Sequence, residues 1–151
     1  MKIEQLISPL DNRYNDKIVD LAINFSESNL NKVRFEIEIE WLIFLCTDGG
    51  KNFPSLSKAH LKNLDLLKVS FSDKSAKRIK SIESKTNHDV KAVEYFIREE
   101  LQKSSNLKNF EHLVHFALTS EDINSLSYAI LLKDALAIYI KQLDVVVKEI
   151  S

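Results

Sequence analysis

The residues best suited to chemistry stand together at positions 86–89, where TNHD combines an amide, an imidazole and a carboxylate. Thr86 and Asp89 have the spacing of a capping box, in which two side chains bind free backbone amides at a helix start. Apolar residues follow with helical spacing, so we expect a helix that begins close to Thr86. Asn87, His88 and Asp89 would then occupy its first turn, where free amides and the helix dipole favour an anion.

A second signal of the same kind lies downstream, where Thr119 and Asp122 have capping-box spacing and Ser120 stands between them. His115 precedes it in LVHFALTSED. Two capped helix starts, each with a histidine in or near it, predict a site for an anionic ligand. The role of each histidine stays open. His115 fits a hydrogen-bonded core histidine as well as a site residue, and His88 beside Asp89 could serve proton transfer or anion binding.

The sequence indicates neither a metal site nor a nucleophile. His112 and His115 are three residues apart, a spacing that suits two ligands on one helix face, but no cysteine or further clustered histidine completes a shell. There is no glycine loop for a phosphate and no serine elbow. We therefore expect no metal site and no catalytic nucleophile.

Composition limits the classes of partner and the cell compartment that we expect for this chain. The formal net charge is −1 with both signs well mixed, which does not favour nucleic acid. Cys46 is the single cysteine, so no internal disulfide forms and a reducing cytoplasm fits best. The longest apolar run, residues 41–46, is too short to span a membrane.

The chain has two glycines, two prolines and almost no strand-like alternation, which predicts an all-α fold. After an irregular lead-in over 1–12, in which Ser8 and Pro9 open a turn, the pattern predicts helices over 15–24, 28–46, 56–68, 72–82, 87–103 and 109–116, and from Ser120 onward. In the first of these we expect Ile18, Leu21 and Ala22 to face inward, and in the second a core stripe of Val33, Ile37, Trp41 and Phe44.

The last predicted helix is apolar over more than half its circumference and shows no stop signal, so it needs partners. We expect a chain cut off within this helix, from a larger oligomeric protein. The corresponding division is an N-terminal helical domain over 1–111 and the start of a central bundle over 112–151.

Several separated segments carry a resemblance to a known family. SPLDNRY, KTNHDVKAVEYF and HFALTSEDINSLSYA resemble, in this order and at these separations, the N-terminal third of the longer bacterial form of adenylosuccinate lyase. VRFEIEIEWL and SFSDKSAKRIKSIE also match, so the resemblance spans essentially the whole chain. The Thr-Ser-x-Asp motif fits the wider fumarase/aspartase superfamily, whereas argininosuccinate lyase and fumarase differ around it.

The resemblance implies an all-helical, homotetrameric enzyme of purine biosynthesis with a long-helix central bundle. Such enzymes release fumarate from adenylosuccinate, giving AMP, and from the succinylated aminoimidazole carboxamide ribotide. They use acid–base catalysis and no cofactor, and they combine three subunits in each active site.

The resemblance also implies roles for individual residues. Arg13 and Tyr14 would bind the nucleotide end of the substrate. His88 would support the acid step, with Asn87 and Asp89 lining the site. Three further residues would also bind the substrate, His115 near the phosphate and Thr119 and Ser120 at a carboxylate.

Two catalytic segments of the family, Thr-His-Gly with the general acid and Ser-Ser-x-Met-Pro-x-Lys-x-Asn with the catalytic serine, do not occur here. We therefore expect this chain to be inactive alone. Two other hypotheses remain. A free-standing helical interaction module would need the apolar stripes but not polar residues at two helix starts. A lyase of the same superfamily would act on another fumarate-releasing substrate.

Overall fold

The computed structural model describes residues 8–151, and within this range the fold is helical without a β-strand. The predicted all-α class is therefore confirmed. The α-helices are α1 (Val19–Asn24), α2 (Glu27–Asp48), α3 (Lys58–Val69), α4 (Asp73–Thr86), α5 (Asp89–Lys103) and α6 (Ser120–Ile150). Three short 3-10 helices join them, η2 (Pro9–Asp11), η3 (Asn15–Lys17) and η4 (Lys108–Leu113).

Most predicted boundaries agree with these elements to within a few residues. In the lead-in, Ser8 caps η2 as its turn signal suggested, and the part before Ser8 lies outside the described residues. Two expectations were wrong. The segment predicted as helical over 109–116 ends at Leu113, and Ala22 of the first predicted helix is exposed, although Ile18 and Leu21 are half-buried.

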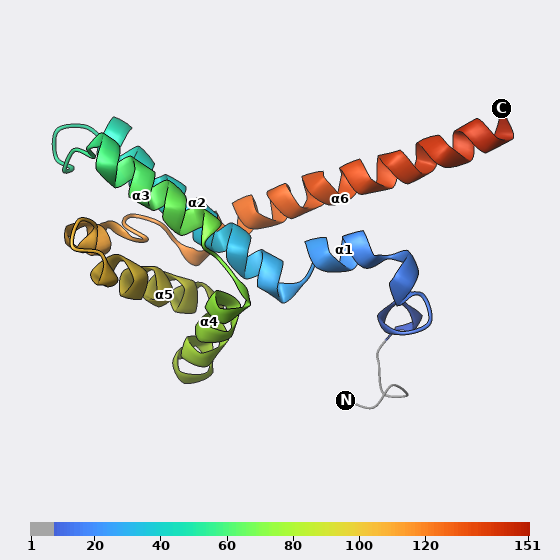
Figure 1. Ribbon diagram of the computed structural model, residues 1–151, viewed down its shortest axis with the longest axis horizontal. Helices are drawn as coiled ribbons and strands as arrows, with labels where there is room; N and C mark the ends of the chain where they lie inside the picture. Colours follow the sequence, from blue (N-terminus) through green and yellow to red (C-terminus); the bar gives the residue numbers. More distant parts are fainter. Residues whose placement is uncertain (1–7) are drawn as a thin grey trace.

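Helix α2 lies at the centre of the molecule, and helices α3 to α6 pack around it (Figure 1). Its Phe35 ring packs against Phe71 before α4 and Phe96 of α5, with centroids 5.3 and 5.6 Å apart. The largest buried apolar side chains come from five helices: Phe35, Ile39, Leu42, Leu64, Ile79, Val90, Val93, Ile97, Leu101, Ile123 and Leu131. Burial of such side chains is the main favourable term in folding.

The predicted core stripe of α2 lies on the wrong face. Val33 is buried, but Ile37 and Trp41 are only half-buried and Phe44 is 48% exposed. The buried face instead carries Phe35, Ile39, Leu42 and Cys46. It also carries Arg34 and Glu38, 3% and 1% exposed, which the apolar pattern could not assign to a core. The two charged residues find partners there, as described below.

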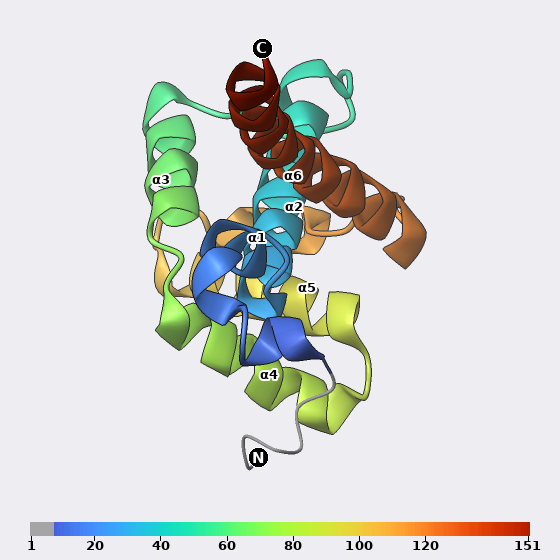
Figure 2. The same ribbon diagram turned by 90° about the vertical axis from the view of Figure 1, so that its right-hand side faces the viewer.

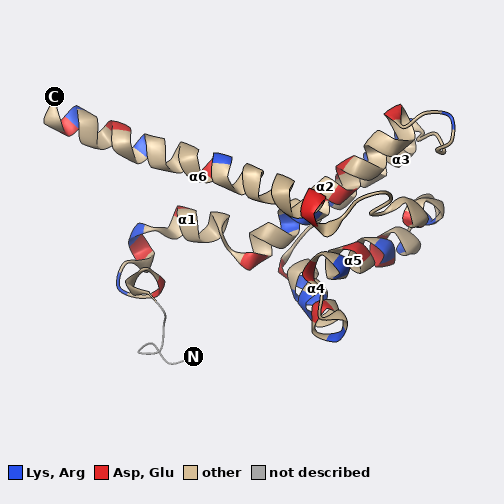
Figure 3. Ribbon diagram, turned by 180° about the vertical axis from the view of Figure 1, so that it is seen from behind, with Lys and Arg blue, Asp and Glu red and all other residues tan. Residues whose placement is uncertain are grey.

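Helix α6 begins at Ser120 as predicted and extends well beyond the other helices (Figure 1), and Figure 2 shows the molecule from the side of its C-terminal end. Its first half packs on α2 and α1, where Asn24 Nδ2 donates to the carbonyl of Leu131 at 2.8 Å. From Leu136 onward, no residue of α6 is buried. The charged residues on this part of the helix are Lys141, Asp144, Lys148 and Glu149, and most of the others are apolar (Figure 3).

The exposed apolar residues of α6 include a regular seam. Their spacing alternates between four and three residues, the heptad pattern by which helices pair along a stripe. The seam consists of Leu132, Leu136, Tyr139, Leu143, Val146 and Ile150, all at least 43% exposed. Across residues 8–151, none of the helices is both long and apolar enough to cross a membrane.

Candidate active site

The junction of α4 and α5 places three of the predicted site residues side by side. Asn87 ends α4 in the left-handed conformation, with φ of 51°, and this reverses the chain direction. His88 is the N-cap of α5, and Asp89 is its first residue. Thr86 is the last residue of α4, so the predicted capping box with Asp89 was wrong; its hydroxyl instead donates to the carbonyl of His88 at 3.2 Å.

The cap of α5 determines which atom of the His88 ring is free. The ring nitrogen Nδ1 accepts a hydrogen bond from the backbone N–H of Lys91 at 3.2 Å. In the neutral ring the proton must then be on Nε2, because one nitrogen of a neutral imidazole accepts while the other donates. His88 is about half-exposed, so Nε2–H is available to donate to a ligand.

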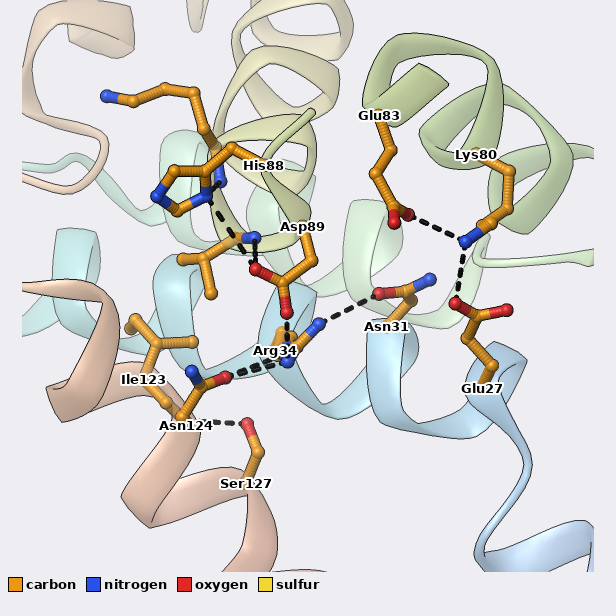
Figure 4. Close-up of polar contacts among 12 residues, drawn as sticks. Glu27, Asn31, Arg34, Lys80, Glu83, His88, Asp89, Ile123, Asn124 and Ser127 are labelled. Atoms are coloured by element: carbon orange, nitrogen blue, oxygen red, sulfur yellow. Dashed lines mark hydrogen bonds and ion pairs between the residues drawn. The ribbon is translucent and has the colours of Figure 1, made fainter. Parts of the chain in front are cut away.

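A buried arginine ties this junction to α6 (Figure 4). Arg34 of α2 donates from Nη2 to Asp89 Oδ2 at 2.7 Å and to Asn124 Oδ1 at 2.7 Å, and its Nε donates to the same amide oxygen at 3.1 Å. Asn31 accepts a longer bond from Nη1, at 3.4 Å. The guanidinium therefore holds the starts of α5 and α6 close together, with its donors directed to fixed acceptors.

The surroundings of Asp89 favour its ionised form. Partial burial alone would raise its pKa, but the Val90 backbone N–H, which donates at 2.8 Å, and the Arg34 guanidinium lower it below the usual value of 3.8. Asp89 thus carries the negative charge that compensates Arg34. Removing either partner would leave an unbalanced charge at the junction.

An open polar hollow lies over this network. It is lined by Asn87, His88, Asp89 and Arg34 together with Tyr128 of α6, and by Glu27, Leu30 and Glu83. Glu27 and Glu83 both pair with Lys80, at 2.7 and 2.9 Å, at the edge of the hollow (Figure 4). Hydrogen-bonding groups from four helices therefore face one space.

The second predicted group lies around the start of α6. Here the predicted capping box is present: the Thr119 N–H and hydroxyl both donate to Asp122 Oδ2, at 2.7 and 2.9 Å. The pKa of Asp122 is lowered chiefly by that backbone N–H, then by the Thr119 hydroxyl and the nearby His115. Ser120, the first residue of α6, is half-buried.

His115 has a partner that the sequence did not indicate. Its Nδ1 lies 2.5 Å from Oε1 of Glu38, a carboxyl group that is fully buried on α2. His115 is therefore hydrogen-bonded and mostly buried, as the alternative of a core histidine expected. Its side chain is still 14% exposed, so the ring also reaches the surface.

Arg13 and Tyr14 do not join either group. Both are exposed, between η2 and η3, and the Arg13 guanidinium stacks over the Tyr14 ring with its carbon 5.2 Å from the centroid. Neither lines the hollow around His88. Their predicted contact with the nucleotide end of a substrate remains a prediction.

Sequence reasoning missed Arg34, Glu38, Asn124 and Tyr128. Arg34 and Glu38 are one helical turn apart, and recognising the face shared with Phe35 and Leu42 would have marked them as buried and paired. Asn124 and Tyr128 carry no local signal of their own. Residues 8–151 contain no group of three or more histidine, cysteine or acidic side chains arranged to hold a metal ion.

Comparison with known proteins shows the family of this chain. A match to the protein family described as Lyase covers residues 12–151, which is nearly the whole chain. The chain belongs to this Lyase family. Both polar groups described above lie inside the matched range, as do all the predicted site residues from Arg13 to Ser120.

Individual relatives in the Lyase family are similar to most of this chain. Adenylosuccinate lyase of Escherichia coli strain K12 is 45% identical over 130 residues, 85% of this chain. The adenylosuccinate lyase of Legionella pneumophila strain Corby is 42% identical over 132 residues, 87% of the chain. That of Buchnera aphidicola from Acyrthosiphon pisum is 38% identical over 130 residues. The chain spans only 28–29% of the length of these relatives.

Proposed function

We propose that this chain forms part of the substrate site of an adenylosuccinate lyase. The reaction is an elimination: a base takes the proton from the succinyl carbon next to a carboxylate, and the carbon–nitrogen bond breaks. The electrons of the C–H bond form the double bond of fumarate, and an acid protonates the departing nitrogen of AMP. The same chemistry applies to the succinylated aminoimidazole carboxamide ribotide.

One observation carries the proposal. The side chains of Asn87, His88 and Asp89 meet Arg34 and Tyr128 around one polar hollow, at the point where the first turns of α5 and α6 approach each other. The Val90 and Lys91 N–H groups of α5 are already bound by Asp89 and His88, but the positive dipole end of a helix start still favours an anionic ligand. A substrate with two succinyl carboxylates and a phosphate suits such a place, and the similarity to adenylosuccinate lyases supports this assignment.

In this proposal His88 is the residue of this chain that contributes to catalysis. Its Nε2–H donates toward the leaving nitrogen or a group bound to it, because Nδ1 is engaged by the Lys91 backbone. Asn87 and Asp89 line the same hollow, and Thr119 and Ser120 bind a substrate carboxylate.

The remaining parts of the proposal concern binding and assembly. Arg13 and Tyr14 bind the nucleotide end and His115 lies near the phosphate, and no cofactor takes part. The enzyme is a cytoplasmic homotetramer, with residues 1–111 as one domain and 112–151 as part of a central bundle. The exposed heptad seam of α6 supports such helix pairing.

The choice of substrate can be tested in a chimera. The 130-residue segment of the Escherichia coli relative that matches this chain is replaced by the corresponding segment of this chain, and fumarate release is followed. We expect turnover of adenylosuccinate and none of argininosuccinate or malate. A folded, tetrameric chimera that converts one of those two, or no substrate at all, would contradict the proposal.

A further inference from the structure

The loop between η4 and α6 is held in an unusual conformation by α2. His115 and Ala117 both have positive φ, 63° and 58°, although neither is a glycine. A residue other than glycine costs free energy in this left-handed conformation. It persists there only where its surroundings fix it, often at a functional site. Two contacts from α2 fix this loop: Glu38 binds the His115 ring, and Trp41 Nε1 donates to the carbonyl of Phe116 at 2.8 Å.

A structural role alone does not explain why a carboxyl group stands at position 38. It is fully buried, and within the described residues its Oε2 has no hydrogen-bond partner. A buried carboxyl with an unpaired oxygen is costly, and an apolar side chain would avoid the cost. Burial raises the pKa of Glu38 above its usual value of 4.5; the hydrogen bond and charge of His115 oppose this rise only in part, and the charge of Glu94 on α5 adds to it.

The charged groups around this pair are few. Glu94 is itself buried and is neutralised by Lys91 at 2.5 Å and by Arg98 at 2.9 Å. Asp122, in the first turn of α6, lies close enough to His115 for the ring to lower its pKa. The His115 ring therefore lies between the buried Glu38 and the capped start of α6, where we place Thr119 and Ser120 at a substrate carboxylate.

From this arrangement we propose that Glu38 is a positioning residue for His115, an inference that rests on the proposed function. Its Oε1 accepts a hydrogen bond from His115 Nδ1–H, which fixes the orientation of the ring and leaves Nε2 available to the substrate. Nε2 donates to an anionic group when the ring carries both protons, and the Glu38 carboxylate then balances the charge of the ring. A group fixed in this way contributes its hydrogen bond without reorganisation when the substrate binds.

The protonation of the ring can be measured in this chain without any activity. Nitrogen-15 NMR of the imidazoles reports which nitrogen carries the proton. We expect His115 to be protonated at Nδ1 with slow proton exchange in the wild type and in Glu38→Gln, because the amide oxygen still accepts. In Glu38→Leu the slowly exchanging proton should be lost. Glu40→Gln, on an exposed part of α2, is the matched control and should change nothing.

Activity in the chimera adds the functional readout. We expect Glu38→Leu to lower kcat/KM on the order of 100-fold through misplacement of the ring. Glu38→Gln should recover most of this loss, and Glu40→Gln should match the wild type. An unprotonated Nδ1 in the wild type would overturn the proposal even if Glu38→Leu fails to fold. An unchanged kcat/KM in folded Glu38→Leu would also overturn it. A wild-type chimera without lyase activity would instead count against the proposed function and leave the NMR result intact.

Discussion

At the scale of single residues, the site depends on charges that are buried and paired. Arg34 is 3% exposed and is compensated by the Asp89 carboxylate, while Asn124 provides a second acceptor. Such a pair contributes little net stability compared with apolar side chains, but breaking it is costly. What it provides here is geometry, since one guanidinium links α2, α5 and α6 directly below His88.

The lowered pKa of Asp89 predicts a pH dependence of stability. Between the folded value and the unfolded value near 3.8, the unfolded chain binds more protons than the folded chain. The contribution of Asp89 is therefore fully present above the unfolded value and is lost as pH falls through the folded value. The Asp89→Asn change removes this contribution. The free energy of unfolding at pH 7 should therefore be higher for the wild type than for the variant, and the difference should shrink at acidic pH.

Urea unfolding of both proteins from pH 7 to pH 2 measures this difference, because its loss begins only below the unfolded pKa near 3.8. Asp144→Asn, at an exposed position of α6, makes the same change of charge away from the junction and serves as the control. A difference between wild type and Asp89→Asn that stays constant over this range would show that the Arg34–Asp89 pair does not stabilise the fold through charge.

At the scale of helices, sequence periodicity succeeded where one face of a helix is polar. It predicted most of the helix boundaries, and the capping-box spacing of Thr119 and Asp122 predicted the start of α6. It failed for α2, because buried Arg34 and Glu38 interrupt the apolar pattern on the true core face. It also failed at Thr86, because the left-handed Asn87 lets α4 continue to the edge of α5. Long-range pairing decided the first case, and local sequence does not report it, whereas the conformation of the neighbouring Asn87 decided the second.

The corrected core face of α2 predicts contrasting effects for two phenylalanines. Phe35→Ala should lower the free energy of unfolding by about 3–5 kcal/mol, because the 1% exposed ring leaves a cavity among Phe71 and Phe96. Phe44→Ala should cost about 1 kcal/mol or less, because that ring is 48% exposed. Denaturant unfolding compares the two, and equal losses would contradict the assigned core face.

At the scale of the whole molecule, the second half of α6 is the part that the other elements within residues 8–151 leave uncovered. Its apolar residues recur with heptad spacing and stay exposed, which is unfavourable for an isolated helix in water. The sequence predicted this need for partners from the wide apolar arc. It could not predict the whole hollow around His88, because Arg34 of α2 and Tyr128 of α6 are distant in the chain from the junction of α4 and α5.

The heptad seam predicts self-association of this chain. We expect its average mass to rise with concentration in light scattering coupled to size-exclusion chromatography. Leu136→Lys combined with Leu143→Lys should shift it toward the monomer, because both changes place a charge in the seam. Asp134→Lys introduces a lysine on an exposed, polar part of the helix and should leave the association unchanged. A seam variant that associates like the wild type would contradict this role.

The most direct test of the central claim compares two histidines in the chimera with the Escherichia coli relative. His88→Ala should lower kcat for fumarate release from adenylosuccinate by about 100-fold or more, the usual contribution of a positioned acid or base. His112→Ala changes an exposed histidine of η4 outside the hollow and should retain wild-type turnover. If the folded His88→Ala chimera releases fumarate as fast as His112→Ala, the assignment of the active site to the α4–α5 junction is wrong.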